Sequence, residues 1–160
     1  MKIGVISDTH IPVNCESIPD KIRECFSHVD MIIHAGDLTE LCVLDELAQI
    51  TPKVEAVRGN MDSQHAQRKL PQKKIIKAGK FKIGLIHGWG PSKNLSNRMA
   101  DEFKNVDVII FGHSHVPVNE ARNGVLFFNP GSATDTVFAK ERTVGILEIT
   151  DKIKGTIIPI

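Results

Sequence analysis

This sequence of 160 residues gives little support for thiol chemistry, for insertion into a membrane or for binding to a polyanion. Its three cysteines, Cys15, Cys25 and Cys42, are odd in number and form no CxxC pair, which argues against a disulfide framework and a thiolate metal site. The formal net charge of +1 is too small to indicate a nucleic-acid or membrane partner by itself. No stretch approaches the roughly 20 apolar residues that a membrane span requires.

The segment from Lys2 to Ile6 predicts a β-strand at the start of the chain. It lacks the long apolar core and the small-residue cleavage site of a signal peptide, so we expect a cytoplasmic protein. The length is typical of one domain, and we expect residues 1–160 to form a single domain around one core. Any preference for anionic ligands then has to come from a local site.

Short apolar runs recur along the chain, and each ends in small and polar residues. Runs of about four residues that are rich in Val and Ile are typical of strands buried on both faces. Apolar residues at helical spacing separate several runs, around residues 18–29, 41–47 and 95–103. This alternation predicts an α/β protein whose first two thirds contain a largely parallel sheet. The five runs are Ile3–Ile6, Met31–Ile33, Val54–Val57, Ile83–Ile86 and Val108–Phe111.

Turn signals later in the sequence predict antiparallel pairs instead. Gly79 separates two strand-like runs, Asn123-Gly124 separates two more, and residues 151–155 separate the last two. The polar stretch Ser63–Lys69 is interpreted as a loop. We therefore expect two packed sheets with helices outside them.

Each of the five apolar runs is followed by a side chain that can bind a metal ion. Ligands of open α/β sheets bind beyond the carboxyl ends of the strands. In an extended chain, residues two positions apart point to the same side, and glycines beside them would let the backbone turn tightly around a site. The five motifs are Asp8-x-His10, Gly36-Asp37, Gly59-Asn60-Met61-Asp62, His87-Gly88 and Gly112-His113-Ser114-His115.

Taken singly, these residues have simpler explanations. An aspartate after a strand commonly caps a helix or forms a turn, and a histidine in an apolar run is commonly a hydrogen-bonded core residue. We interpret His34 in that way. The argument for chemistry is therefore the order of all five motifs after five successive strand-like runs.

This series of motifs resembles that of the calcineurin-like metallophosphoesterases. The short length and the segment Asn129-Pro130-Gly131-Ser132 resemble the compact branch of bacterial and archaeal phosphodiesterases. The resemblance implies an α/β fold of four layers, an αββα sandwich in which helices flank two mixed β-sheets. It also implies two metal sites, one held by Asp8, His10, Asp37 and His115 and the other by Asp37, Asn60, His87 and His113.

Two cations about 3.5–4 Å apart repel each other, so they need a shared anionic ligand, here Asp37. A bridging water would be acidified to hydroxide near neutral pH. Two divalent ions bring four positive charges, whereas Asp8, Asp37 and hydroxide bring three negative ones. The remaining positive charge suits a monoanionic phosphodiester, so we expect metal-dependent hydrolysis of phosphodiester bonds by a bridging hydroxide. Ligands of this kind fit Mn²⁺, Fe²⁺, Co²⁺, Ni²⁺ or Zn²⁺, and the resemblance makes Mn²⁺ the first to try.

The sequence departs from the family at Met61. Many members have a histidine directly after the metal-binding asparagine, where it can protonate the leaving group. Without that acid, activated or cyclic esters should be favoured over phosphomonoesters. Asp62 is a candidate for orienting a group in the active site, with a role in a turn or cap as the alternative.

A second hypothesis is a non-catalytic binding scaffold, similar to the retromer subunit of this fold. Complete metal ligands argue against it, and the missing histidine argues for it. A nuclease would need a basic groove or a capping domain. We expect a small phosphodiester as the substrate and no membrane or firm nucleic-acid partner. The apolar segment Leu126–Phe128 is explained equally by an interface in a homo-oligomer and by a buried strand.

Overall fold

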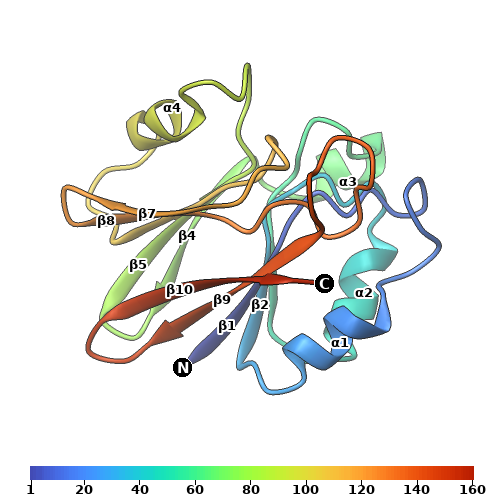
Figure 1. Ribbon diagram of the computed structural model, residues 1–160, viewed down its shortest axis with the longest axis horizontal. Helices are drawn as coiled ribbons and strands as arrows, with labels where there is room; N and C mark the ends of the chain where they lie inside the picture. The colour runs from blue at the N-terminus through green and yellow to red at the C-terminus, as the bar shows by residue number, and fades with distance from the viewer.

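Ten strands form two mixed sheets in the computed structural model, which describes residues 1–160 (Figure 1). In the first sheet β1 and β2 are parallel, as are β2 and β3, whereas β9 runs antiparallel to both β1 and β10. Its order is β10 (Ile153–Pro159), β9 (Thr143–Ile149), β1 (Lys2–Ile6), β2 (Met31–His34) and β3 (Val54–Ala56).

The second sheet has a parallel centre and antiparallel edges. Strand β6 is parallel to both of its neighbours, and the edge strands β4 and β7 are antiparallel to theirs. Its order is β4 (Lys73–Ala78), β5 (Phe81–Ile86), β6 (Val108–Ile110), β8 (Val125–Asn129) and β7 (Val118–Arg122). The predicted hairpins at Gly79 and Asn123-Gly124 are therefore present.

The layers follow from the two faces of each strand. Ile3 and Val5 of β1 pack into a core between the two sheets, whereas Ile6 packs into a second core on the outer face. Helices α1 (Asp20–Phe26), α2 (Cys42–Ala48) and α3 (Gln64–Lys69) lie on the outer side of the first sheet, and α4 (Leu95–Asp101) covers the second (Figure 1). The predicted αββα sandwich is confirmed.

The prediction of a loop over Ser63–Lys69 is wrong, because residues Gln64–Lys69 form α3. The prediction rested on polar composition. In the structure the Ser63 hydroxyl accepts a hydrogen bond from the Ala66 N–H and caps the helix, and Ala66 alone is buried. One buried alanine among polar residues gives too weak a pattern for a helix to be recognised.

One further detail differs from expectation, and one open alternative is decided. The last hairpin turns at residues 150–152, so β10 begins at Ile153 and includes part of the predicted turn. Phe127 and Phe128 are buried in β8, so the buried strand accounts for their apolar character. No helix is long and apolar enough to cross a membrane.

Candidate metal centre

The seven predicted metal ligands follow five strands that belong to both sheets. Asp8 and His10 follow β1, Asp37 follows β2, and Asn60 follows β3 in the first sheet. His87 follows β5 in the second sheet, and His113 and His115 follow β6. Each set of strands is mutually parallel, so all seven residues leave the ends of strands that point the same way within their sheet.

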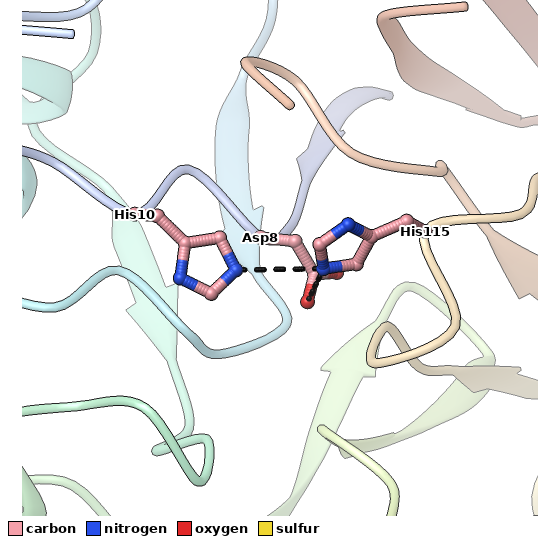
Figure 2. Close-up of side chains that lie close together, drawn as sticks. All are labelled: Asp8, His10 and His115. Atoms are coloured by element: carbon pink, nitrogen blue, oxygen red, sulfur yellow. Dashed lines mark hydrogen bonds and ion pairs between the residues drawn. The ribbon is translucent and has the colours of Figure 1, made fainter. Parts of the chain in front are cut away.

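Asp8, His10 and His115 form one compact group of donors (Figure 2). His115 Nε2 lies 3.4 Å from Asp8 Oδ1 and 3.4 Å from His10 Nε2. The Asp8 side chain is fully buried, and one ligand atom from each of the three residues lies within 4.8 Å of the others. Two imidazole nitrogens beside a buried carboxylate make a donor set for a divalent transition-metal ion.

Asp37 lies between this group and His87. Its Oδ2 atom is 3.1 Å from His87 Nε2 and 3.9 Å from His10 Nε2. Its Oδ1 atom accepts a hydrogen bond of 2.6 Å from the Met61 N–H, which fixes the orientation of the carboxylate. Asp37, Asp8 and His87 form a second group of donors within 4.8 Å, so the Asp37 carboxylate lies beside imidazole donors from both predicted sets.

The ring of His87 is oriented for coordination. Its Nδ1–H donates to the Ala35 carbonyl at 2.8 Å, which leaves Nε2 directed into the site. Nε2 is buried and has no hydrogen-bond partner. Asp37 Oδ2 lies close to His87 Nε2 but is not aligned to accept a hydrogen bond from it, so the contact between the two side chains is an ion pair. A buried, unpartnered ring nitrogen fits a bound cation.

His113 and Asn60 fit a cation for a related reason. His113 Nε2 lies 2.8 Å from the Gly90 carbonyl oxygen, and Nδ1 lies 3.0 Å from Asn60 Oδ1. A neutral imidazole carries one proton. When Nε2 donates to Gly90, Nδ1 and the Asn60 oxygen face each other as two acceptors. A cation between them would satisfy both lone pairs.

The backbone of five of the seven candidate ligands is left-handed, and the assumption of extended chain at the DxH and HxH motifs is wrong. The φ angles are 53° at Asp8, 44° at His10, 54° at Asp37, 69° at His113 and 56° at His115. Each such residue costs about 1–3 kcal/mol. Neighbouring backbone hydrogen bonds hold the conformation, including those from Asp8 N to Gly36 O and from His10 N to Asp37 O.

Two glycines leave room for the carboxylates. A Cβ atom on Gly59 would lie 2.1 Å from Asp37 Oδ1, and one on Gly112 would lie 2.7 Å from Asp8 Oδ2. Neither glycine has a positive φ angle. These two glycines are therefore required for space beside the site and not for a tight turn.

Charges in the site are strongly coupled. Burial alone would raise the pKa values of Asp8 and Asp37, but contacts with His115 and His87 hold both below their ordinary value. Burial would lower the pKa of His87, but Asp37 and Asp8 raise it to about 9, and Asp8 and Asp135 raise that of His115 to about 9. Without a metal ion, the carboxylates draw protons onto the histidines. A cation would replace those protons.

Asp135 is a site residue that the sequence analysis missed. Its Oδ2 atom accepts a hydrogen bond from His115 Nδ1–H, which directs Nε2 of that ring toward Asp8 and His10. Burial opposes its ionisation, but the Val137 N–H and His115 hold its pKa at about 2. Asp135 lies between β8 and β9, outside the strand-end pattern that identified the other residues, so no motif marked it.

Asp62 and His34 occupy positions behind the site. The two oxygens of Asp62 accept hydrogen bonds from the Thr39 and Gly59 N–H groups, at 2.7 and 2.6 Å, so this carboxylate joins two loops. His34 is fully buried, where Nδ1 accepts from the Gly36 N–H and Nε2 lies 3.0 Å from the Thr9 hydroxyl. Burial lowers the pKa of His34 to about 3, so the ring is neutral.

Two pockets share Asn60. One has a volume of about 270 Å³ and is polar, with Arg58, Gln67 and Gln72 beside His87 and Trp89. The other has a volume of about 340 Å³ and reaches His10, His113, His115 and Asp135. The candidate ligands therefore lie where two pockets of different chemistry meet, and both pockets are open to a ligand.

Comparison with known proteins agrees with this geometry. A family model described as the calcineurin-like phosphoesterase superfamily domain matches residues 1–152. A probable metallophosphoesterase of Methanocaldococcus jannaschii is 39% identical over 163 residues, covering 100% of this chain and 82% of the relative. The chain belongs to the calcineurin-like phosphoesterase superfamily. That membership places it among metal-dependent hydrolases of phosphoric esters.

Two solved structures are similar over their whole length. A novel archaeal phosphodiesterase has a TM-score of 0.81 and 29% identity, with 100% of both chains covered. Vps29 from Entamoeba histolytica, in complex with Zn²⁺, has a TM-score of 0.77 and 27% identity, with 99% of both chains covered. The fold of this chain is therefore shared with a protein described as a phosphodiesterase and with Vps29.

Proposed function

We propose that this protein hydrolyses phosphodiesters with two divalent cations. One would be held by Asp8, His10, Asp37 and His115, and the other by Asp37, Asn60, His87 and His113. The observation that carries the proposal is the position of Asp37, whose carboxylate lies within 3.9 Å of imidazole nitrogens from both sets, His10 and His87.

When bound, the cations would neutralise charge on the phosphate oxygens and acidify a water molecule for attack on phosphorus. The chain's own residues orient the donors. Ala35 and Gly90 accept from the rings of His87 and His113, and Asp135 accepts from His115. These contacts leave the other nitrogen of each ring free for a cation. No side chain of the protein is needed as a nucleophile.

The preference for a diester rests on charge and on Met61. Two aspartates and a hydroxide together would carry three negative charges against the four positive charges of two divalent ions, and the remaining positive charge suits a monoanion. Met61 lines the pocket that contains five of the candidate ligands and offers no proton to a leaving group. The similarity to an archaeal phosphodiesterase supports the same preference.

A metal-restoration assay tests this function. The protein is stripped with a chelator, supplied with Mn²⁺, and assayed on bis(4-nitrophenyl) phosphate beside 4-nitrophenyl phosphate. We expect Mn²⁺ to restore activity on the diester in preference to the monoester. Fe²⁺, Co²⁺, Ni²⁺ and Zn²⁺ are compared in parallel. Preference for the monoester, or no turnover with any of these ions, would refute the proposal.

The similarity to Vps29 supports a second candidate, a binding scaffold without useful catalysis. Such a scaffold would bind metal ions and still leave both nitrophenyl esters intact. Calorimetric titration with Mn²⁺ beside the activity assay therefore separates the two candidates.

A further inference from the structure

Four exposed apolar side chains gather at the candidate metal centre. Val13 is 77% exposed, Met61 60%, Val137 79% and Phe138 83%, and all four line the pocket of about 340 Å³. They are half of the eight large hydrophobic residues that the whole chain exposes. We call these four residues the apolar rim.

The apolar rim comes from three separate loops. Val13 follows β1, Met61 follows β3, and the other two residues precede β9. Scattered apolar residues on a surface need no explanation, but a group that converges on one pocket marks a binding site. The pocket is also lined by His10, His113 and His115, so whatever fills it lies beside the metal donors.

The loop that carries Phe138 is fixed by hydrogen bonds. Asp135 accepts from the backbone N–H groups of Val137, Phe138 and Ala139, at 2.8, 3.1 and 3.1 Å. The same carboxylate accepts from His115. One buried residue therefore sets both the direction of a candidate ligand and the position of two rim residues.

We propose that the apolar rim binds an apolar or aromatic organic group of the substrate, while its phosphate group lies at the metal donors. This assignment rests on the proposed function and adds the class of ester to it. A cavity of about 150 Å³ holds benzene, so the pocket has room for an aromatic ring. Planar rings suit a surface formed by Phe138, Val13 and Met61 because they bury much apolar area with little loss of freedom.

The experiment compares two stable monoanions that differ in one group, the monomethyl esters of phenylphosphonate and of methylphosphonate. Each is titrated calorimetrically into the Mn²⁺-loaded full-length protein. We expect the phenyl compound to bind at least about tenfold more tightly, since one buried ring exceeds the 1.4 kcal/mol that a tenfold change represents. Equal affinities would overturn the assignment, and binding of neither compound would overturn it in favour of a protein partner for the rim.

Three variants locate the preference. In Phe138→Ala the phenyl compound should lose most of its advantage, whereas the methyl compound should bind as before. Ile75→Ala, which removes an apolar side chain 55% exposed on β4, should leave the preference unchanged. A preference that survives both Phe138→Ala and Val13→Ala would overturn the assignment.

The outcome is separate from that of the proposed function. If the wild-type protein prefers the phenyl compound but hydrolyses no phosphodiester, the ligand site stands and the catalytic proposal fails. If it hydrolyses bis(4-nitrophenyl) phosphate but shows no preference between the phosphonates, catalysis stands and the role of the apolar rim fails.

Discussion

The bottom of the candidate site and its rim are built in opposite ways. We use the name polar floor for Asp8, Asp37 and His87, which are each no more than 2% exposed and held by hydrogen bonds. The residues of the apolar rim are at least 60% exposed, although Asp37 and Asp135 hold the backbone of three of the four. The floor is therefore ordered before any substrate arrives, whereas the rim gains contacts only when one binds. The polar floor would determine which reaction takes place, and the apolar rim would determine which molecule is bound.

Removing a floor carboxylate should have the largest effect. In Asp37→Ala we expect kcat to fall by about a thousandfold or more, because both cations lose a shared ligand that offsets their repulsion. The metal content after dialysis should fall with it. Cys25→Ala, in α1, serves as the control and should keep nearly full activity. An Asp37→Ala variant with full activity would refute the shared ligand.

The second largest effect should come from competition between protons and Mn²⁺ for His87 and His115. The metal-free pKa values of His87 and His115 are raised to about 9. Below that pH a cation has to displace two protons, so Mn²⁺ affinity should rise with pH, by up to about a hundredfold per pH unit, and level off above about 9. Titrations in buffers of different ionisation enthalpy measure the protons released. An affinity that is constant between pH 6.5 and 9 would contradict the assignment of these two rings.

Asp135 connects His115, a candidate ligand beside the polar floor, with the loop of the apolar rim, and Asp135→Asn tests that connection. The amide can place its NH₂ group against His115, so the ring loses its acceptor and its fixed direction. We expect Mn²⁺ affinity to fall by about 10–100-fold. When Mn²⁺ is limiting, most of the lost activity should appear as a lower kcat. Asp151→Asn, at an exposed turn, is the control. If excess Mn²⁺ does not restore activity while the fold is intact, Asp135 acts in some other way.

The smallest change should come from adding an acid to the rim. Met61→His would place a proton donor beside the leaving group, and we expect activity on diesters with poor leaving groups to rise about tenfold relative to nitrophenyl esters. Met61→Leu keeps the apolar surface and adds no acid, so it should show no such gain. Equal relative rates in the two variants would argue that the natural chain does not lack a general acid at this position.

The sequence predicted the floor better than the rim because the two leave different signals. Strand ends are marked by apolar runs, so Asp8, Asp37 and His87 could be located together before their distances were known. Helix α3 was missed because its buried face is a single alanine, Ala66. Asp135 was missed because it lies in a loop, where no periodicity applies.

The apolar rim could not be foreseen for a similar reason. Val13, Val137 and Phe138 are ordinary apolar residues in sequence, and only the folded chain shows that they are exposed at one pocket. The left-handed backbone of the candidate ligands was also hidden. Histidine and aspartate adopt that conformation more often than most residues do, but still only in a small minority of cases, and the spacing of two in DxH and HxH suggested the opposite.

That backbone has a consequence for the evolution of the protein. Glycine adopts the left-handed region without penalty, so glycine at His10 or His113 would relieve the strain of the backbone there, but it would remove a candidate ligand and give the unfolded chain more freedom. Few residues adopt this conformation readily, so the backbone as well as the candidate metal chemistry restricts which substitutions these two positions accept.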